Sequence, residues 1–232
     1  MGASSFAAVL AGVAGGALLV DLDVTGGGVD VTLGIESVAG ARWSGLQVAG
    51  GRLDPAALLD GLPRWGAVPV LAADVAELAP DAVRQVLAVG RQAGPVVLDL
   101  SRGGGPERSA ALDECSLVVV LARGDVDGLV AAHAVVDALP APLPCGLVCR
   151  RGEVRPIDAA RLVGRPLLGE LPALDGKRMV LKSHRLPAVA ARVASGVLRG
   201  LLPAKSLRTE PCEIASGPRN APAGAPARTP AA

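Results

Sequence analysis

Short apolar runs recur along this chain at intervals that a helix can fill, and this alternation constrains the fold most. The runs are apolar throughout, as in strands that are buried on both faces of a parallel sheet. The segments between them place apolar residues at helical spacing. The sequence therefore predicts an α/β fold, with a mostly parallel, twisted sheet and helices on both faces. The predicted strands are 17–22, 68–72, 95–100, 117–122, 145–149 and 166–168, and the predicted helices are 4–14, 55–62, 80–91, 126–139, 157–163 and 186–202.

The strands and helices end near residue 202, where the composition changes. Hydrophobic residues make up 50% of the 232 residues, enough for a domain to bury a core without disulfides. From residue 203 onward Pro, Ala, Gly, Arg and Ser dominate and few apolar groups remain to be buried. We therefore expect one α/β domain over residues 1–202 and a disordered Pro/Ala-rich tail over residues 203–232.

Charge and aromatic content argue against nucleic acid as a partner. Lys and Arg number 23 and Asp and Glu 22, so the net charge of +1 gives no general polyanion-binding surface. Only 1% of the residues are aromatic, too few for a platform on which bases stack. Cys115, Cys145, Cys149 and Cys212 form no second pair at zinc-ligand spacing. We expect them to be reduced, as in a cytoplasmic protein.

The first twenty residues carry no charge and are long enough to span a bilayer. They lack the basic start of a signal peptide, and they end in an apolar run that leads into Asp21 and Asp23. A helix, a Gly turn and a buried strand are the preferred interpretation, and a membrane anchor is the alternative. We expect no transmembrane segment.

Acidic residues follow two of the predicted strands. Asp21 and Asp23 come after the first strand, and Asp99 ends the third. In parallel sheets ligands bind at the carboxyl ends of the strands, where these side chains would meet. Carboxylates there suit Mg²⁺, which takes one or two of them together with phosphate oxygens. The alternative is that these acids cap the helices that begin after the strands.

The order and spacing of these residues resemble the MinD/ParA family of P-loop ATPases, especially its CpaE-like, septum-site-determining-like branch. The most specific stretch is 20–34, where Asp-x-Asp is followed seven residues later by Asp30. Residues 96–100 resemble the family's Walker B strand, and residues 166–172 its late Pro-Leu-Leu-Gly-x-Leu-Pro segment. Arg42-Trp43 and residues 62–66 resemble the CpaE-like branch. The resemblance covers about residues 2–202 and implies a P-loop NTPase fold.

The resemblance implies a role for each of these side chains. Asp23 would be the catalytic acid near the attacking water, and Asp30 would belong to the adjoining switch segment. Asp99 would hold Mg²⁺ through water, and the hydroxyl of Ser4 would bind the same ion. ATP and Mg²⁺ are the cofactors that the resemblance implies.

The phosphate-binding loop departs from the family pattern. Gly2-Ala3-Ser4-Ser5 matches only the end of G-x-x-x-x-G-K-[ST], and Ala3 stands where the lysine should be. Losing that lysine removes a charge that offsets phosphate, so we expect weak or absent ATP binding. The simpler interpretation of these residues is a Ser N-cap. The family's first strand would precede residue 1, so we expect the sheet to lack it and Met1 to be an internal codon of an N-terminally truncated gene model.

Two functions follow from the resemblance. The first is a regulatory protein of septum-site determination or of pilus or secretion assembly, which acts through protein partners and hydrolyses nucleotide weakly or not at all. It would be cytoplasmic and reach a membrane only through those partners. The alternative is an active ATPase that forms a homodimer on ATP. An unrelated doubly wound fold, such as that of a small-molecule transferase, is the remaining alternative.

Overall fold

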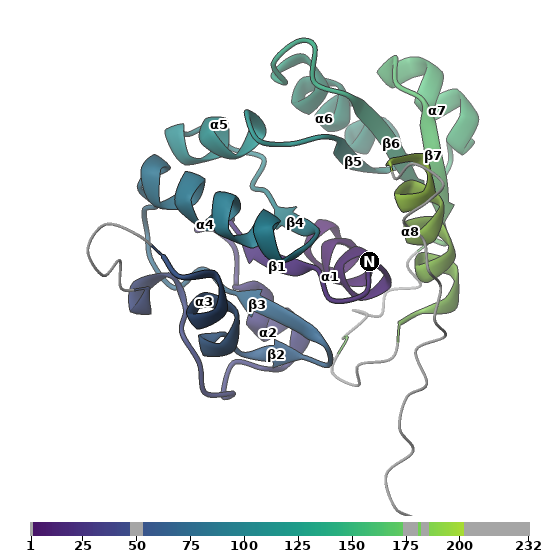
Figure 1. Ribbon diagram of the computed structural model, residues 1–232. Helices are drawn as coiled ribbons and strands as arrows, with labels where there is room; N and C mark the ends of the chain where they lie inside the picture. The colour runs from purple at the N-terminus through teal and green to yellow at the C-terminus, as the bar shows by residue number, and fades with distance from the viewer. Residues whose placement is uncertain (1, 47–52, 174–180, 182–185, 202–232) are drawn as a thin grey trace, which may run out of the picture.

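The computed structural model describes residues 2–46, 53–173, 181 and 186–201. Helices and strands alternate along most of this length (Figure 1). The helices are α1 (Ala3–Val13), α2 (Val29–Leu33), α3 (Pro55–Gly61), α4 (Pro80–Ala93), α5 (Pro106–Leu112), α6 (Val126–Asp137), α7 (Pro156–Val163) and α8 (Ala188–Leu201), with a 3-10 turn η1 (Trp43–Gly45). The strands are β1 (Leu18–Asp21), β2 (Arg64–Trp65), β3 (Val68–Leu71), β4 (Val96–Asp99), β5 (Val118–Arg123), β6 (Cys145–Arg150) and β7 (Leu167–Leu171).

The strands form two half-sheets. The first has the order β2-β3-β1-β4 and the second the order β5-β6-β7. All neighbouring strands are parallel except β2 and β3, which form an antiparallel hairpin. The mostly parallel α/β architecture predicted from the sequence is confirmed.

The sheet is interrupted between β4 and β5. Within the described residues β4 pairs only with β1, and β5 pairs only with β6. No strand pairing in the described part of the chain joins the two half-sheets.

The helices cover both faces of the strands. On one face α1 and α8 share a single core with residues from both half-sheets, among them Leu19, Val70 and Val148. On the other face two separate cores form, one under α3, α4 and α5 and one under α6 and α7. The shared core beneath α1 and α8 holds the two half-sheets in one frame.

All six predicted strands and all six predicted helices are present, with ends within three residues of the prediction. The sequence missed β2, α2 and α5, which are short. The predicted tail over residues 203–232 lies outside the described residues. No helix in the described part of the chain is both long and apolar enough to cross a membrane.

Candidate functional site

The carboxyl edge of the first half-sheet gathers the predicted acids. Asp21 ends β1 and Asp99 ends β4, and the two are register partners in the parallel ladder. Asp23 follows β1 by two residues. The hydroxyl of Ser4, in the first turn of α1, approaches the Asp99 carboxylate as a hydrogen-bond donor. The structure thus brings these four side chains to one edge, while their functional roles stay predictions.

Asp21 organises this edge from inside. Its side chain is only 1% exposed. One carboxylate oxygen accepts the N–H of Asp23 at 3.0 Å, and the other accepts those of Val29 at 2.9 Å and Ala73 at 3.3 Å. Burial raises the pKa of Asp21, and these three hydrogen bonds oppose the rise. A single carboxylate therefore ties together the end of β1, the start of α2 and the segment after β3.

Asp99 is nearly as well buried, at 4% exposed. Burial raises its pKa from 3.8 to about 6, and the negative charges of Asp21 and Asp23 add to the rise. The Ser4 hydroxyl acts in the opposite direction because it stabilises the carboxylate. Two adjacent buried carboxylates favour a proton or a cation between them, which is the electrostatic condition for a Mg²⁺ site.

Asp23 lies nearer the surface and organises its own turn. Its Oδ1 atom accepts the backbone N–H of Thr25 at 3.2 Å and the Thr25 hydroxyl at 2.8 Å. This is the local role that acids often take after strands. These two hydrogen bonds use only Oδ1, so Oδ2 is the oxygen of Asp23 that could contact a ligand.

The predicted switch residue Asp30 lies in α2 and pairs with Arg42. Arg42 Nε lies 3.2 Å from Asp30 Oδ2, and both side chains are less than one-fifth exposed. Next to it, the indole N–H of Trp43 donates to the backbone carbonyl of Asp21 at 2.8 Å. The remaining Arg42 donors bond the carbonyls of Ile35, Glu36, Val38 and Gly40 at 3.0–3.3 Å.

Asp21, Arg42 and Trp43 therefore position the site. The sequence analysis expected Asp21 at this edge among the carboxylates that suit Mg²⁺, and it gave Arg42 and Trp43 no role there. The Asp-x-Asp pattern after a buried strand was the signal for Asp21. For Arg42 and Trp43 the only signal was the resemblance of the pair to the CpaE-like branch.

The start of α1 does not have the Ser N-cap that was the simpler interpretation of Gly2-Ala3-Ser4-Ser5. Gly2 is the N-cap, without a side-chain hydrogen bond, and Ser4 already belongs to the helix. Gly2 and Ala3 are exposed, while Ser5 is buried. The uncapped N–H groups of the first turn suit an anion, as helix N-termini generally do.

The residues fit Mg²⁺ better than they fit a triphosphate. The Ser4 hydroxyl and the Asp99 carboxylate are oxygen ligands of the kind that Mg²⁺ takes together with water and phosphate. Within the described ranges, no group of three or more His, Cys, Asp and Glu side chains is arranged to hold a metal by itself. α1 contains no basic residue that could face a phosphate. The alignment of Ala3 with the family's lysine stays a prediction.

The carboxyl edge of the second half-sheet carries arginines as well as acids. Arg123 and Arg150 end β5 and β6, and Arg151 follows. Arg123 pairs with Asp125 at 3.4 Å, and Arg151 pairs with Glu170 at 3.1 Å. Cys149, next to Arg150 in β6, is fully buried. The first half-sheet thus gathers acids at its carboxyl edge, whereas the second has paired acids and arginines there.

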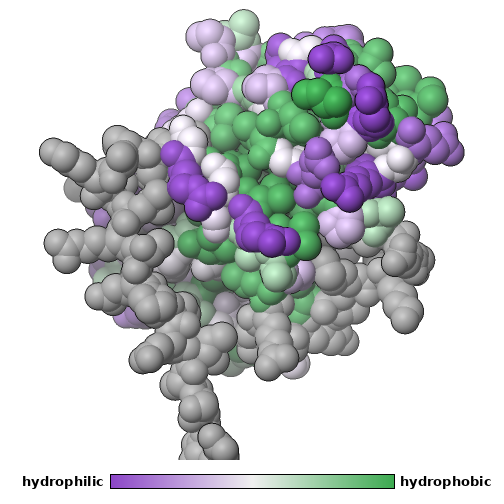
Figure 2. Space-filling model, turned by 90° about the vertical axis from the view of Figure 1, so that its right-hand side faces the viewer, coloured by the Kyte–Doolittle hydropathy of each residue, from purple (hydrophilic) through white to green (hydrophobic). Residues whose placement is uncertain are grey.

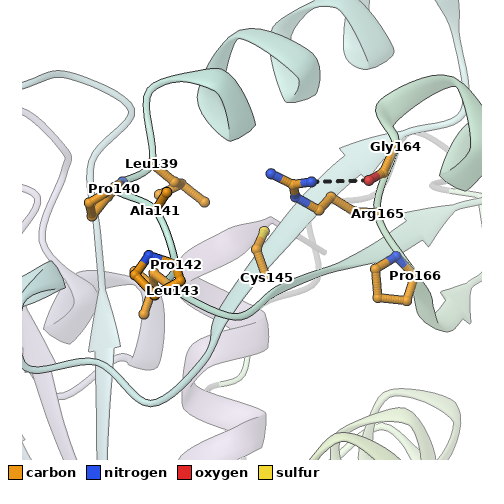
Figure 3. A pocket seen from close by; sticks show the side chains of 9 residues that line it. All are labelled: Leu139, Pro140, Ala141, Pro142, Leu143, Cys145, Gly164, Arg165 and Pro166. Atoms are coloured by element: carbon orange, nitrogen blue, oxygen red, sulfur yellow. Dashed lines mark hydrogen bonds between the residues drawn. The ribbon is translucent and has the colours of Figure 1, made fainter.

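A cavity of about 350 Å³ opens at the opposite edge of the second half-sheet (Figure 3). Cys145, at the amino end of β6, and Arg165 line it, and Arg165 donates to the carbonyl of Gly164 at 3.1 Å. Burial raises the pKa of the Cys145 thiol, although Arg165 opposes the rise, so the thiol is protonated at neutral pH. Because this cavity lies at the amino ends of the strands, it is not part of the candidate site.

Two relatives show clear sequence similarity to this chain. They are uncharacterized proteins of two Mycobacterium tuberculosis strains, CDC 1551 and H37Rv, and each is 38% identical over 211 residues. The match covers 85% of this chain and 60% of each relative, so the chain spans less than two thirds of their length. No model of a known protein family matches the sequence.

Solved structures establish the fold. A ParA family ATPase from Chlorobium tepidum has a TM-score of 0.68 at 14% identity, with 84% of this chain and 90% of that chain covered. The septum site-determining protein MinD of Pyrococcus horikoshii, complexed with Mg-ADP, has a TM-score of 0.68 at 18% identity, covering 86% and 92%. A MinC:MinD complex of Aquifex aeolicus gives 0.67 at 14% identity, covering 88% and 92%. The chain has the MinD/ParA ATPase fold, as the resemblance implied.

Proposed function

We propose that this chain is a regulatory protein of the CpaE-like, septum-site-determining-like kind, which acts through protein partners and hydrolyses ATP weakly or not at all. The process it serves is septum-site determination or pilus or secretion assembly. One observation carries the proposal: Ser4 approaches Asp99, the pair that the resemblance would assign to Mg²⁺, whereas α1, where the resemblance would put a lysine at Ala3, contains no basic residue.

The charge balance of the site supports weak nucleotide binding. Asp21, Asp23 and Asp99 share one edge, and like charges there repel a polyphosphate. Two unit charges about 4 Å apart interact by about 4 kcal/mol at the effective dielectric constant of a protein surface. A lysine would supply an attraction of this size. Without it, Mg²⁺ and the N–H groups of α1 are the remaining sources of attraction.

The fold and the surface support a role through partners. The Aquifex MinD structure is a complex with MinC. In this chain α7 and α8 expose the apolar side chains of Ile157, Leu162 and Val189, and Figure 2 shows apolar surface between separate charged groups on that side of the molecule. Apolar surface of this kind marks protein interaction sites. We place the protein in the cytoplasm, with membrane association only through its partners.

The second candidate is an ATPase that forms a homodimer on ATP. The approach of Ser4 to Asp99 supports this candidate, because the resemblance would assign both groups to Mg²⁺. The Pyrococcus MinD with the same fold is complexed with Mg-ADP.

Calorimetric titration of the full chain with Mg-ATP tests the phosphate side of the site. We expect weak binding by the natural chain and binding about tenfold tighter, or more, in Ala3→Lys, because a charge-assisted contact is worth about 1.5–3 kcal/mol. Ala3→Gln is the matched control of similar length without charge, and it should bind like the natural chain. Tight Mg-ATP binding by the natural chain, or an equal gain in both variants, would refute the proposal.

A further inference from the structure

The cavity at the amino ends of β6 and β7 has two walls that are attached to the second half-sheet (Figure 3). One wall is the loop 139–143, and directly after it the carbonyl of Pro144 accepts the N–H of Val118 at 2.8 Å. The other wall ends at Pro166, whose carbonyl accepts the N–H of Leu147 at 2.8 Å. Because both walls are held by the strands, the cavity is formed before any ligand binds, which lowers the cost of binding.

The end of α7 places Arg165 in the second of these walls. Gly164 has a left-handed backbone (φ 69°) that ends the helix, and the N–H of Arg165 then donates to the carbonyl of Ala160 at 3.1 Å. This is a common helix end, and it fixes the backbone of Arg165. From there the side chain extends toward Cys145, whose thiol the guanidinium approaches as a hydrogen-bond donor (Figure 3).

The charge of Arg165 is not neutralised by an acid. Other arginines of this half-sheet have carboxylate partners, as Arg151 has in Glu170 and Arg161 has in Asp158. Arg165 forms no ion pair with any residue that the structure describes. No acidic side chain is among the described residues that line the cavity. The cavity therefore carries one positive charge that is open to a negatively charged ligand.

The rest of the lining is mostly apolar, which sets the class of ligand. Sites for small molecules have about 300–1,000 Å³ and combine apolar walls with a few polar groups. This cavity of about 350 Å³ lies at the small end of that range. A guanidinium can hold a carboxylate through two parallel hydrogen bonds, whereas a phosphate carries more charge than one arginine neutralises. The apolar side chains are those of Leu139, Pro140, Ala141, Pro142, Leu143 and Pro166.

A second cavity shares the loop 140–143 with the first but differs from it in charge. It has about 310 Å³, and Asp113 and Cys115 line it. Both Cys115 and Cys145 are half-buried, and burial raises the pKa of both thiols. The negative charge of Asp113 would repel a carboxylate from the second cavity. The two cavities thus form a matched pair, each with one cysteine that reports on its occupancy.

We propose that the first cavity binds a small molecule that has one carboxylate and an apolar body. The carboxylate pairs with Arg165, and the body packs against Leu139 and Leu143. The site lies at the edge of the sheet opposite to Ser4 and Asp99, so it does not depend on the nucleotide chemistry proposed above.

Alkylation by N-ethylmaleimide, located by mass spectrometry, tests this site. The full chain is titrated with hexanoate at constant ionic strength, and we expect alkylation of Cys145 to slow while that of Cys115 stays unchanged. Hexanamide has the same body without the charge and should need about fivefold higher concentration, or more, for the same protection of Cys145. Acetate has the charge without the body and should need about tenfold higher concentration or more.

Two variants separate the charge of Arg165 from a general effect of lost charge. Arg165→Gln should lose the preference for hexanoate over hexanamide, because glutamine keeps hydrogen-bonding groups but no charge. Arg161→Gln is the matched control, at an exposed arginine of α7 that does not line the cavity, and it should keep the preference.

Several results would overturn the proposal. They are no protection of Cys145 by hexanoate, equal protection of Cys145 and Cys115, and equal potency of hexanoate with hexanamide or with acetate. Inorganic phosphate that protects Cys145 as well as hexanoate does would show a general anion site instead. A preference for hexanoate that survives in Arg165→Gln would equally contradict the assignment. If that variant does not fold, the comparison of these small molecules on the natural chain decides by the same criteria.

Discussion

At the scale of single residues, buried carboxylates define this site. Asp99 is held with a pKa of about 6, against 3.8 for an exposed aspartate, chiefly because burial disfavours its charge. Between these two values the folded chain binds more protons than the unfolded chain. The free energy of unfolding therefore falls as the pH rises through this window, and the charged carboxylate destabilises the fold at neutral pH.

Asp99→Asn should accordingly stabilise the protein at a pH above the Asp99 pKa of about 6 and have little effect at a pH below 3.8. A shift of this size corresponds to roughly 3 kcal/mol as an upper bound, so we expect the Tm at about pH 7.5 to rise by about 5 °C or more. Thermal unfolding followed by circular dichroism at both ends of the window measures this. Asp60→Asn, at an exposed aspartate, is the control and should change nothing. The same rise at acidic and neutral pH would contradict the explanation.

Arg42 holds the loop after α2 through one carboxylate and four carbonyls. Arg42→Lys should lower the free energy of unfolding by about 1–3 kcal/mol, because an ammonium group cannot span acceptors that a planar guanidinium reaches. Urea unfolding measures the loss. Arg84→Lys, in an exposed pair with Asp81, should cost under about 0.5 kcal/mol. Equal losses in the two variants would show that Arg42 has no special structural role.

At the scale of elements, the close approach of α4 to the first half-sheet depends on Gly90. A Cβ there would lie 2.8 Å from Leu18 Cδ2 and 3.0 Å from Val96 Cγ2, whereas a Cβ at Gly196 of α8 would meet nothing within 4 Å. Gly196→Ala should stabilise by about 0.5–1 kcal/mol through helix propensity. Gly90→Ala should lose that gain to the clash and be at least about 1 kcal/mol less stable than Gly196→Ala. Chemical unfolding of the two variants measures this difference. Equal free energies of unfolding for Gly90→Ala and Gly196→Ala would contradict the close packing of α4 on the sheet.

The sequence predicted the elements that repeat a strong pattern and missed those that depend on tertiary contacts. β1 and α4 were evident from apolar runs and helical spacing. The five-residue helix α2 has too few residues for a periodic signal and is fixed instead by the bond from the Val29 N–H to Asp21. α5 follows a glycine run that looked like loop, and only Pro106 at its start marked it. β2 is two residues long and exists because it pairs with β3.

Of the candidate site, the sequence predicted the acids at the strand ends but not the long-range contacts that position them. Asp23 and Asp99 could be expected at this edge because each lies at the end of a predicted strand, whereas Asp30, which lies in α2, was assigned to a switch segment only through the resemblance. The tie that Asp21 makes to Val29 and Ala73 joins residues up to 52 positions apart, which no local pattern reveals.

At the scale of the whole molecule, the interrupted sheet separates an acidic edge, with Asp21, Asp23 and Asp99, from an edge where Arg123 and Arg151 are paired with acids. Helices α1 and α8 hold the halves together through one core. The acidic edge carries Ser4 and Asp99, which we propose as Mg²⁺ ligands, and the adjoining α1 contains no basic residue that could bind phosphate. This combination is the basis for proposing regulation through partners rather than turnover.

Phosphate release from ATP by the full chain, with and without Mg²⁺, tests that central claim most directly. Asp99→Asn is the matched variant, because it removes the metal-side carboxylate and keeps the shape of the side chain. The account predicts no Mg²⁺-dependent release above the rate of that variant. Sustained Mg²⁺-dependent hydrolysis by the natural chain that Asp99→Asn abolishes would contradict it and establish the ATPase instead.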